Sequence, residues 1–125
     1  MSEKSWIQNA IIYQVYPLTF NYGQGSESDP YKGAYGNLKG ITEKADYIKS
    51  LGVDAIWISP FYEWNRTGMG YDITNYEKVS PMYGTAEDLQ ELTKTFHSNG
   101  IKVLADQVFN HCSMEHEWFK KFLQN

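Results

Sequence analysis

The sequence predicts an α/β fold with parallel strands, in the order strand, helix, strand, helix, strand, helix. Two helical patterns each end at a glycine, Gly52 and Gly100, and a short apolar run follows each glycine within a few residues. Glycine adopts the left-handed conformation at little cost, so it commonly ends a helix and turns the chain into a strand. The apolar runs are continuous rather than alternating, which is typical of strands covered on both faces.

The first half of the chain supplies two strands and one helix. A strand is expected over 11–16, before Pro17, and a second over 55–59. Between them a helix is expected over 38–51, with Asn37 as its N-cap. Its apolar residues recur at spacings of three and four, the pattern of an amphipathic helix; they are Leu38, Ile41, Ala45 and Ile48.

The second half repeats this order. A helix is expected over 85–97, capped by Thr85, with Asp88 as the partner in a capping box. Its expected buried stripe consists of Leu89, Leu92 and Phe96. A strand over 102–107 and a helix from about 116 to the end complete the pattern, with right-handed crossovers. No linker or low-complexity stretch divides residues 1–125, so they are interpreted as one segment.

Two connections are long, 17–36 and 60–84, and both follow the carboxyl end of a predicted strand. Connections longer than about 12–15 residues are usually functional or disordered. Folds of this class place their sites at the carboxyl ends of the strands. The short connections at Gly52 and Gly100 fall at the opposite edge, so the asymmetry predicts a site at the carboxyl edge.

Composition excludes several classes of function. Fifteen acidic and eleven basic residues give a charge of −4, and Arg66 is the one arginine, so no clustered basic surface for nucleic acid is expected. No apolar run approaches the roughly 20 residues of a membrane span.

The N-terminal stretch has no signal-peptide core and Cys112 is the one cysteine, which favours a cytoplasmic setting. Aromatic residues make up 16%, which suits either ring stacking on a ligand or core packing.

Two clusters are candidates for a binding site. Asp106-Gln107-Val108-Phe109-Asn110-His111 places an acid, an amide and an imidazole together, which could bind a polyhydroxylated ligand. The alternative is a paired structural carboxylate followed by ordinary loop residues. Gly70-Tyr71-Asp72 combines a close backbone approach, a stacking ring and a hydrogen-bond acceptor, or else forms a turn with an Asx-type bond.

Several motifs together resemble the α-amylase family, glycoside hydrolase family 13, in its α-glucosidase and oligo-1,6-glucosidase branch. The resemblance runs from about residue 6 to 120, in order and with similar spacing. The motifs are Tyr13-Gln14-Val15-Tyr16-Pro17, Gly40-Ile41-Thr42-Glu43-Lys44, Gly52 through Pro60, Gly70-Tyr71-Asp72, Gly84-Thr85 and Asp106 through His111.

The resemblance implies a (β/α)₈ barrel, of which this chain holds about the first three βα units. By position, Tyr71 and Asp72 would line the subsite for the terminal glucose, with the ring stacking on the sugar and the carboxylate bonding its hydroxyls. His111 would contact the same sugar. Asp106 would support the floor of the active site, and Asn110 matches an asparagine that can be a structural calcium ligand in amylases.

The resemblance also implies what is missing. Retaining glycosidases need two carboxylates about 5 Å apart, and in this family they follow the fourth and fifth strands. We therefore expect no catalytic residue among residues 1–125, and no glycosidase activity from this fragment alone. The loop after the first strand has only Glu27 and Asp29 as charged oxygen donors, so no metal is expected there. No cofactor is expected for this segment.

Two readings of function follow. The first is the N-terminal part of an enzyme acting on α-glucosides or oligosaccharides, truncated or split. The alternative is a non-catalytic βα module that binds sugar weakly or assembles with itself. Three strands alone would leave sheet surface uncovered, which favours a homo-oligomer.

Overall fold

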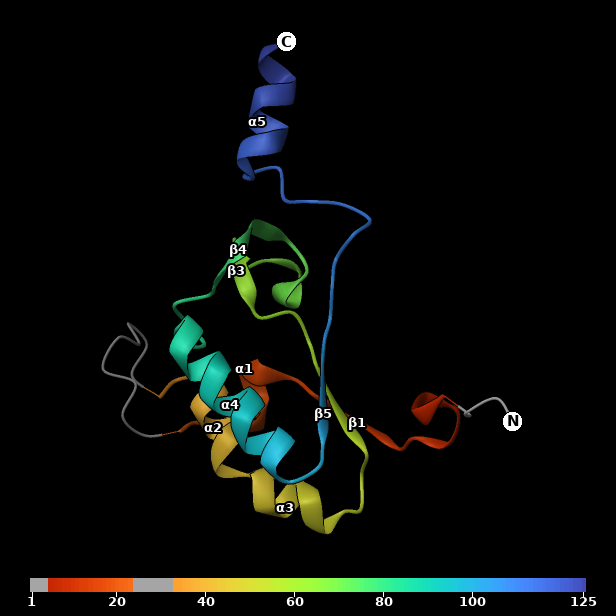
Figure 1. Ribbon diagram of the computed structural model, residues 1–125. Coiled ribbons are helices and arrows are strands. Elements are labelled where there is room, and N and C mark those ends of the chain that lie inside the picture. The colour runs from red at the N-terminus through yellow and green to blue at the C-terminus, as the bar shows by residue number, and fades with distance from the viewer. Residues whose placement is uncertain (1–4, 24–32) are drawn as a thin grey trace.

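A three-stranded parallel sheet forms the centre of the computed structural model, which describes residues 5–23 and 33–125 (Figure 1). Its strands are β1 (Ile12–Val15), β2 (Ala55–Ile58) and β5 (Lys102–Ala105), in the spatial order β1-β2-β5. The predicted α/β class and the three parallel strands are confirmed. The sheet stays open and does not close into a barrel.

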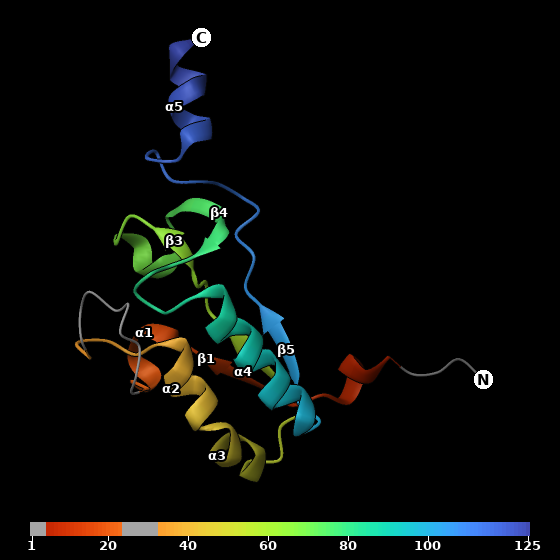
Figure 2. The same cartoon turned by 60° about the vertical axis from the view of Figure 1, so that its left-hand side comes forward.

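Three helices cover one face of the sheet, namely α2 (Leu38–Glu43), α3 (Ala45–Ser50) and α4 (Ala86–Ser98) (Figures 1 and 2). The continuous helix predicted over 38–51 is wrong in one respect, because Lys44 leaves helical geometry, with φ −98° and ψ 12°, and separates α2 from α3. The predicted stripe is buried in both halves, so the break keeps these side chains against the core.

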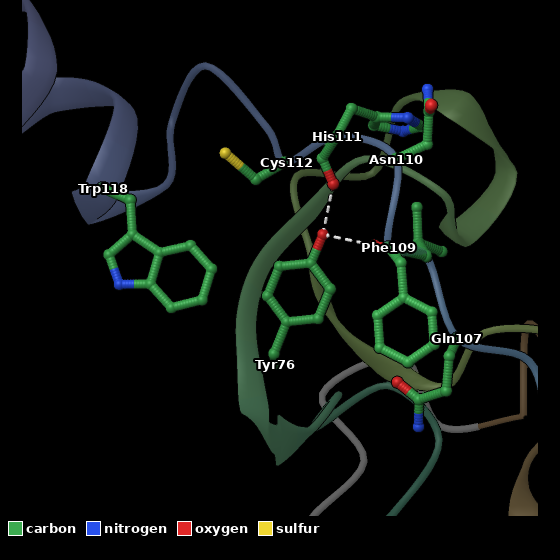
Figure 3. A pocket seen from close by; sticks show the side chains of 8 residues that line it. Tyr76, Gln107, Phe109, Asn110, His111, Cys112 and Trp118 are labelled. Atoms are coloured by element: carbon green, nitrogen blue, oxygen red, sulfur yellow. Dashed lines mark hydrogen bonds between the residues drawn. The ribbon is translucent and has the colours of Figure 1, made fainter.

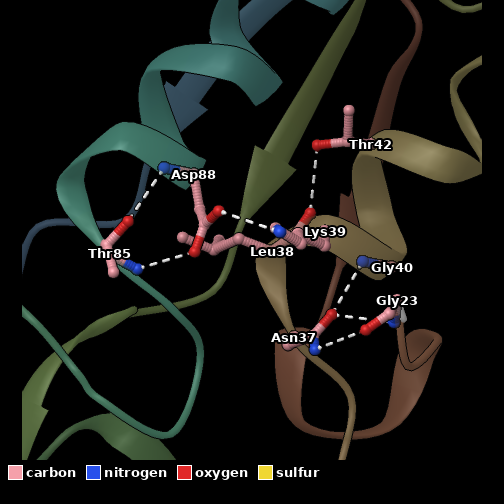
Figure 4. Close-up of polar contacts among 8 residues, drawn as sticks. All are labelled: Gly23, Asn37, Leu38, Lys39, Gly40, Thr42, Thr85 and Asp88. Carbon is pink, nitrogen blue, oxygen red and sulfur yellow. Dashed lines mark hydrogen bonds and ion pairs between the residues drawn. The ribbon is translucent and has the colours of Figure 1, made fainter. Parts of the chain in front are cut away.

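Capping side chains fix where the helices begin (Figure 4). Asn37 Oδ1 accepts from the backbone N–H of Gly40 at 2.8 Å, as predicted for the N-cap of α2. At α4, Thr85 and Asp88 form the predicted capping box, with bonds of 2.9 and 3.2 Å. Asp88 also pairs with Lys39 at 3.9 Å and so links α4 to α2.

The segment 60–84, predicted only as a long connection, contains a β-hairpin. Strands β3 (Tyr62–Trp64) and β4 (Ile73–Val79) pair antiparallel, and the 3₁₀ turn η2 (Gly68–Gly70) lies between them. Trp64 and Ile73 are buried. The hairpin stands over the carboxyl end of the parallel sheet (Figure 1).

Three short helices complete the described residues. The 3₁₀ helix η1 (Trp6–Asn9) precedes β1, and α1 (Pro17–Phe20) follows it. The predicted C-terminal helix is α5 (Glu117–Gln124), and the His116 ring caps it by accepting from the backbone N–H of Trp118 at 3.0 Å. Figures 1 and 2 show α5 beyond the hairpin, away from the parallel sheet, so α5 does not cover that sheet.

The sheet face opposite the three helices is open in the described part of the chain. Side chains alternate along β1, where Val15 is buried in the core while Ile12 and Gln14 are exposed. On β2, Trp57 faces the same side as Gln14 and is 38% exposed. No described helix is long and apolar enough to cross a membrane.

Candidate functional site

An open hollow of about 430 Å³ lies at the carboxyl ends of β1 and β2. Gln14 reaches it from β1, and Tyr16 from the residue that follows β1. Ser59 reaches it from the end of β2, and Met69 and Tyr71 from the turn before β4. This is the edge at which the long connections predict a site. Apolar ring surface and hydrogen-bonding groups therefore meet in one depression.

Gly70 allows the turn to bring Tyr71 to the hollow. Its φ is +96°, and a Cβ at this position would lie 3.0 Å from the carbonyl oxygen of Pro60. Only glycine takes this conformation without strain. Tyr16 Oη donates to the carbonyl oxygen of Met69 at 3.3 Å and holds the turn from the side of β1.

Asp106 accepts two hydrogen bonds on one carboxylate oxygen. Tyr71 Oη donates to Asp106 Oδ2 at 2.8 Å, and Trp57 Nε1 donates to the same atom at 3.0 Å. Sequence reasoning missed Trp57, because it stands in an apolar run that reads as a buried strand. Burial raises the pKa of Tyr71 above 10.0, and the bond to Asp106 raises it further, so Tyr71 is a neutral donor at pH 7.

His111 joins the same cluster through the backbone. Its Nε2 lies 2.9 Å from the carbonyl oxygen of Tyr71, so the nitrogen carries the proton and donates. Tyr76 Oη contacts the carbonyl oxygens of Val108, at 2.9 Å, and of His111, which secures the chain after β5 against β4. Tyr71, Asp106 and His111 are thus brought together.

Asp72 is bonded on the other side of the turn. Its Oδ2 accepts from Ser113 Oγ at 3.1 Å and lies 3.2 Å from Thr67 Oγ1. The side chain is half-buried, and among the described residues it makes no hydrogen bond to Tyr71, Asp106 or His111. Asp72 is tied to the same segment after β5, through Ser113.

Asn110 lines a second hollow, of about 470 Å³ (Figure 3). Its wall includes Cys112 and an aromatic pair, Trp118 and Tyr76. The two rings stack with their centroids 5.7 Å apart and an interplanar angle of 12°. The exposed Asn110 therefore opens on a different depression from the one that Tyr71 lines.

A metal centre is not formed by the side chains that the structure describes. Within residues 5–23 and 33–125, no three or more His, Cys, Asp or Glu side chains gather closely enough to hold a metal ion. Glu27 and Asp29, the charged donors of the loop after β1, lie outside the described residues.

Comparison with known proteins gives one consistent set of similarities. The family model described as "Alpha amylase, catalytic domain" matches residues 14–125. An alpha-glucosidase of Saccharomyces cerevisiae is 52% identical over 120 residues, which is 96% of this chain and 19% of the relative. An oligo-1,6-glucosidase of the same yeast is 52% identical over 116 residues, 93% of this chain and 19% of the relative.

Solved structures agree. The crystal structure of a MutB mutant with its substrate sucrose matches with a TM-score of 0.84 and 43% identity, over 94% of this chain and 20% of that one. Trehalose-6-phosphate hydrolase of Bacillus licheniformis matches with a TM-score of 0.83 and 42% identity, again over 94% and 20%. The chain thus spans about a fifth of the length of these relatives.

Proposed function

The chain belongs to the alpha-amylase catalytic-domain family, and from this premise we propose that it forms one wall of an active site for α-glucosides or oligosaccharides. The match covers residues 14–125 and corresponds to the N-terminal part of alpha-glucosidase-like and oligo-1,6-glucosidase-like enzymes. The observation that carries the proposal is the cluster of Tyr71, Asp106 and His111 at the carboxyl edge of the parallel sheet.

Each residue of this wall has a proposed role. The ring of Tyr71, which is 36% exposed, offers the apolar face of a terminal glucose a flat surface. Asp106 holds the Tyr71 hydroxyl. His111 donates to the Tyr71 carbonyl through Nε2, which leaves Nδ1 for a sugar hydroxyl.

Asp72 and Asn110 have proposed roles as well, although in the described part of the chain neither side chain is hydrogen-bonded to the cluster of Tyr71, Asp106 and His111. Asp72 Oδ2 is bonded within the protein, so Oδ1 is the oxygen proposed to accept from the glucose hydroxyls. Asn110 lies at the second hollow, and its proposed part is to support the segment that carries His111.

We propose no glycosidase activity for residues 1–125 alone. A retaining mechanism needs a nucleophile and an acid/base about 5 Å apart. By the family resemblance those carboxylates follow later strands, while Asp72 Oδ2 and Asp106 Oδ2 each accept hydrogen bonds from neighbouring side chains.

The second candidate function, a sugar-binding or self-assembling module, is favoured by the open sheet face that Trp57 and Ile12 share. A cytoplasmic setting is proposed from the single cysteine, Cys112.

Two measurements on the purified chain test the proposal. Maltose is expected to show saturation transfer in NMR, and the Tyr71→Ala variant should lose it. The matched control is Tyr47→Ala, which removes an exposed tyrosine of α3 and should keep the transfer. Turnover of p-nitrophenyl α-glucoside should stay at the buffer rate, and turnover abolished by Asp106→Ala would contradict the assignment of roles.

A further inference from the structure

The central strand supplies a donor to the carboxylate that holds Tyr71. Trp57 stands in the middle of β2, beside Gln14 of β1 and Leu104 of β5. Its Nε1 lies 3.0 Å from Asp106 Oδ2, the atom that also accepts from Tyr71 Oη. An indole N–H can only donate and an ionised carboxylate can only accept, so the direction of both bonds at Asp106 is fixed.

Side chains from the other two strands line the hollow beside Tyr71. Ser59, at the end of β2, lines it together with Gln14 of β1, and Gln14 Nε2 donates to Ser59 Oγ at 3.3 Å. Asp106, one residue beyond β5, accepts from the Tyr71 hydroxyl. Trp57 is bonded to the Asp106 carboxylate and not to the phenol.

We propose that Trp57 is a positioning residue of the sugar site, whose indole N–H holds the Asp106 carboxylate where it fixes the ring plane of Tyr71. Asp106 is half-buried and stands one residue beyond β5, where its side chain could otherwise turn toward water. A hydrogen bond to a charged acceptor is stronger than a neutral one, so the indole restricts the carboxylate effectively. This inference rests on the proposed function, because a fixed ring plane matters only where a sugar stacks.

A purely structural role for Trp57 has a different signature. A tryptophan that only packs would lower stability without acting through Asp106. Positioning through Asp106 requires instead that the effect of replacing Trp57 disappears once Asp106 has been removed. A double-mutant cycle measures this dependence directly.

The cycle consists of wild type, Trp57→Phe, Asp106→Ala and the double variant. The control is Trp118→Phe, which alters an exposed tryptophan of α5 that stacks on Tyr76. Two quantities are measured on each chain. They are the pKa of the Tyr71 phenol, from ¹³Cζ NMR of labelled tyrosine, and the dissociation constant for methyl α-D-glucopyranoside.

Trp57→Phe is expected to move the pKa of Tyr71 toward 10.0, because burial and the contact with Asp106 are both loosened. It should also weaken glucoside binding roughly fivefold, because only part of the free energy of the lost Trp57–Asp106 bond is transmitted to the ring that stacks on the sugar. In the Asp106→Ala background the same change should alter binding less than about twofold. Trp118→Phe should alter neither quantity.

The inference would be overturned if Trp57→Phe left both the pKa of Tyr71 and the dissociation constant unchanged. It would also be overturned if Trp57→Phe had the same effect in wild type and in Asp106→Ala. Failure of the proposed function is a distinct result, in which wild type binds no glucoside at all. The pKa of Tyr71 then decides the role of Trp57 without reference to sugar.

Discussion

The Asn37 side chain makes two hydrogen bonds to the backbone of Gly23. Oδ1 accepts from the Gly23 N–H at 2.9 Å, and Nδ2 donates to the Gly23 carbonyl oxygen at 3.1 Å. The same Oδ1 caps α2 at Gly40, and Asn37 is 1% exposed (Figure 4). One buried amide therefore joins the chain after α1 to the start of α2.

Asn37→Ala should destabilise the fold by about 3 kcal/mol, because the buried backbone groups of Gly23 and Gly40 lose their partner. Urea unfolding followed by circular dichroism measures the change. The control is Asn99→Ala, at the end of α4, where the side chain makes one half-buried bond to the Thr95 carbonyl. The control should lower the free energy of unfolding by less than about 1 kcal/mol. Equal losses in the two variants would show that the paired hydrogen bonds of Asn37 to Gly23 stabilise the fold no more than an ordinary side-chain bond.

Gly70→Ala should disturb the site as well as the fold. The new Cβ would lie 3.0 Å from the Pro60 oxygen, and alanine at φ +96° is strained. We expect a loss of about 1–3 kcal/mol and a shift of the Trp57 indole N–H resonance in ¹H–¹⁵N spectra, since Tyr71 moves relative to Asp106.

The matched control for this variant is Gly52→Ala. Gly52 has φ +75°, but no atom lies within 4 Å of its Cβ position. It should show the backbone strain while leaving the Trp57 resonance in place. An unmoved resonance in Gly70→Ala would contradict the argument that this glycine positions Tyr71.

Alkaline pH should destabilise the fold partly through Tyr83. This tyrosine is fully buried, and burial raises the pKa of its phenol far above 10.0. The unfolded chain ionises near 10.0 while the folded chain stays neutral, so this contribution is complete below that pH and is lost as the pH rises above it. Urea unfolding between pH 8 and 11 should show a shallower decline for Tyr83→Phe than for wild type. Parallel declines would contradict the assignment.

Self-association through the open sheet face stays a prediction. Ile12 is 39% exposed on that face, beside the edge of the sheet. Light scattering should show masses above 14.5 kDa at micromolar concentrations, and Ile12→Lys should reduce them. The control is Tyr47→Lys on α3, which should not. A constant monomer mass in wild type would exclude this association.

The parallel core could be predicted because its signals are local. Gly52 and Gly100, with φ of 75° and 72°, end their helices as expected, and the strands follow within a few residues. The break at Lys44 could not be predicted, since neither glycine nor proline stands there and the apolar spacing continues across it.

The hairpin and the role of Trp57 depend on contacts distant in sequence. The segment 60–84 holds prolines and glycines that read as loop, and β4 lacks a regular alternation of buried and exposed residues. Trp57 meets its acceptor 49 residues later, and only the paired strands show that the two are neighbours. Tyr71 and His111 were predicted from motifs, yet the bond between them appears only in the folded chain.

Titration of the ¹⁵N-labelled chain with glucose tests most directly whether these residues form a sugar-contacting wall. The amides of Tyr71, Asp72 and His111 should shift progressively over tens of millimolar glucose, and Tyr71→Ala should abolish the response while Tyr47→Ala preserves it. Resonances that stay fixed in wild type, or that move equally in both variants, would contradict the account.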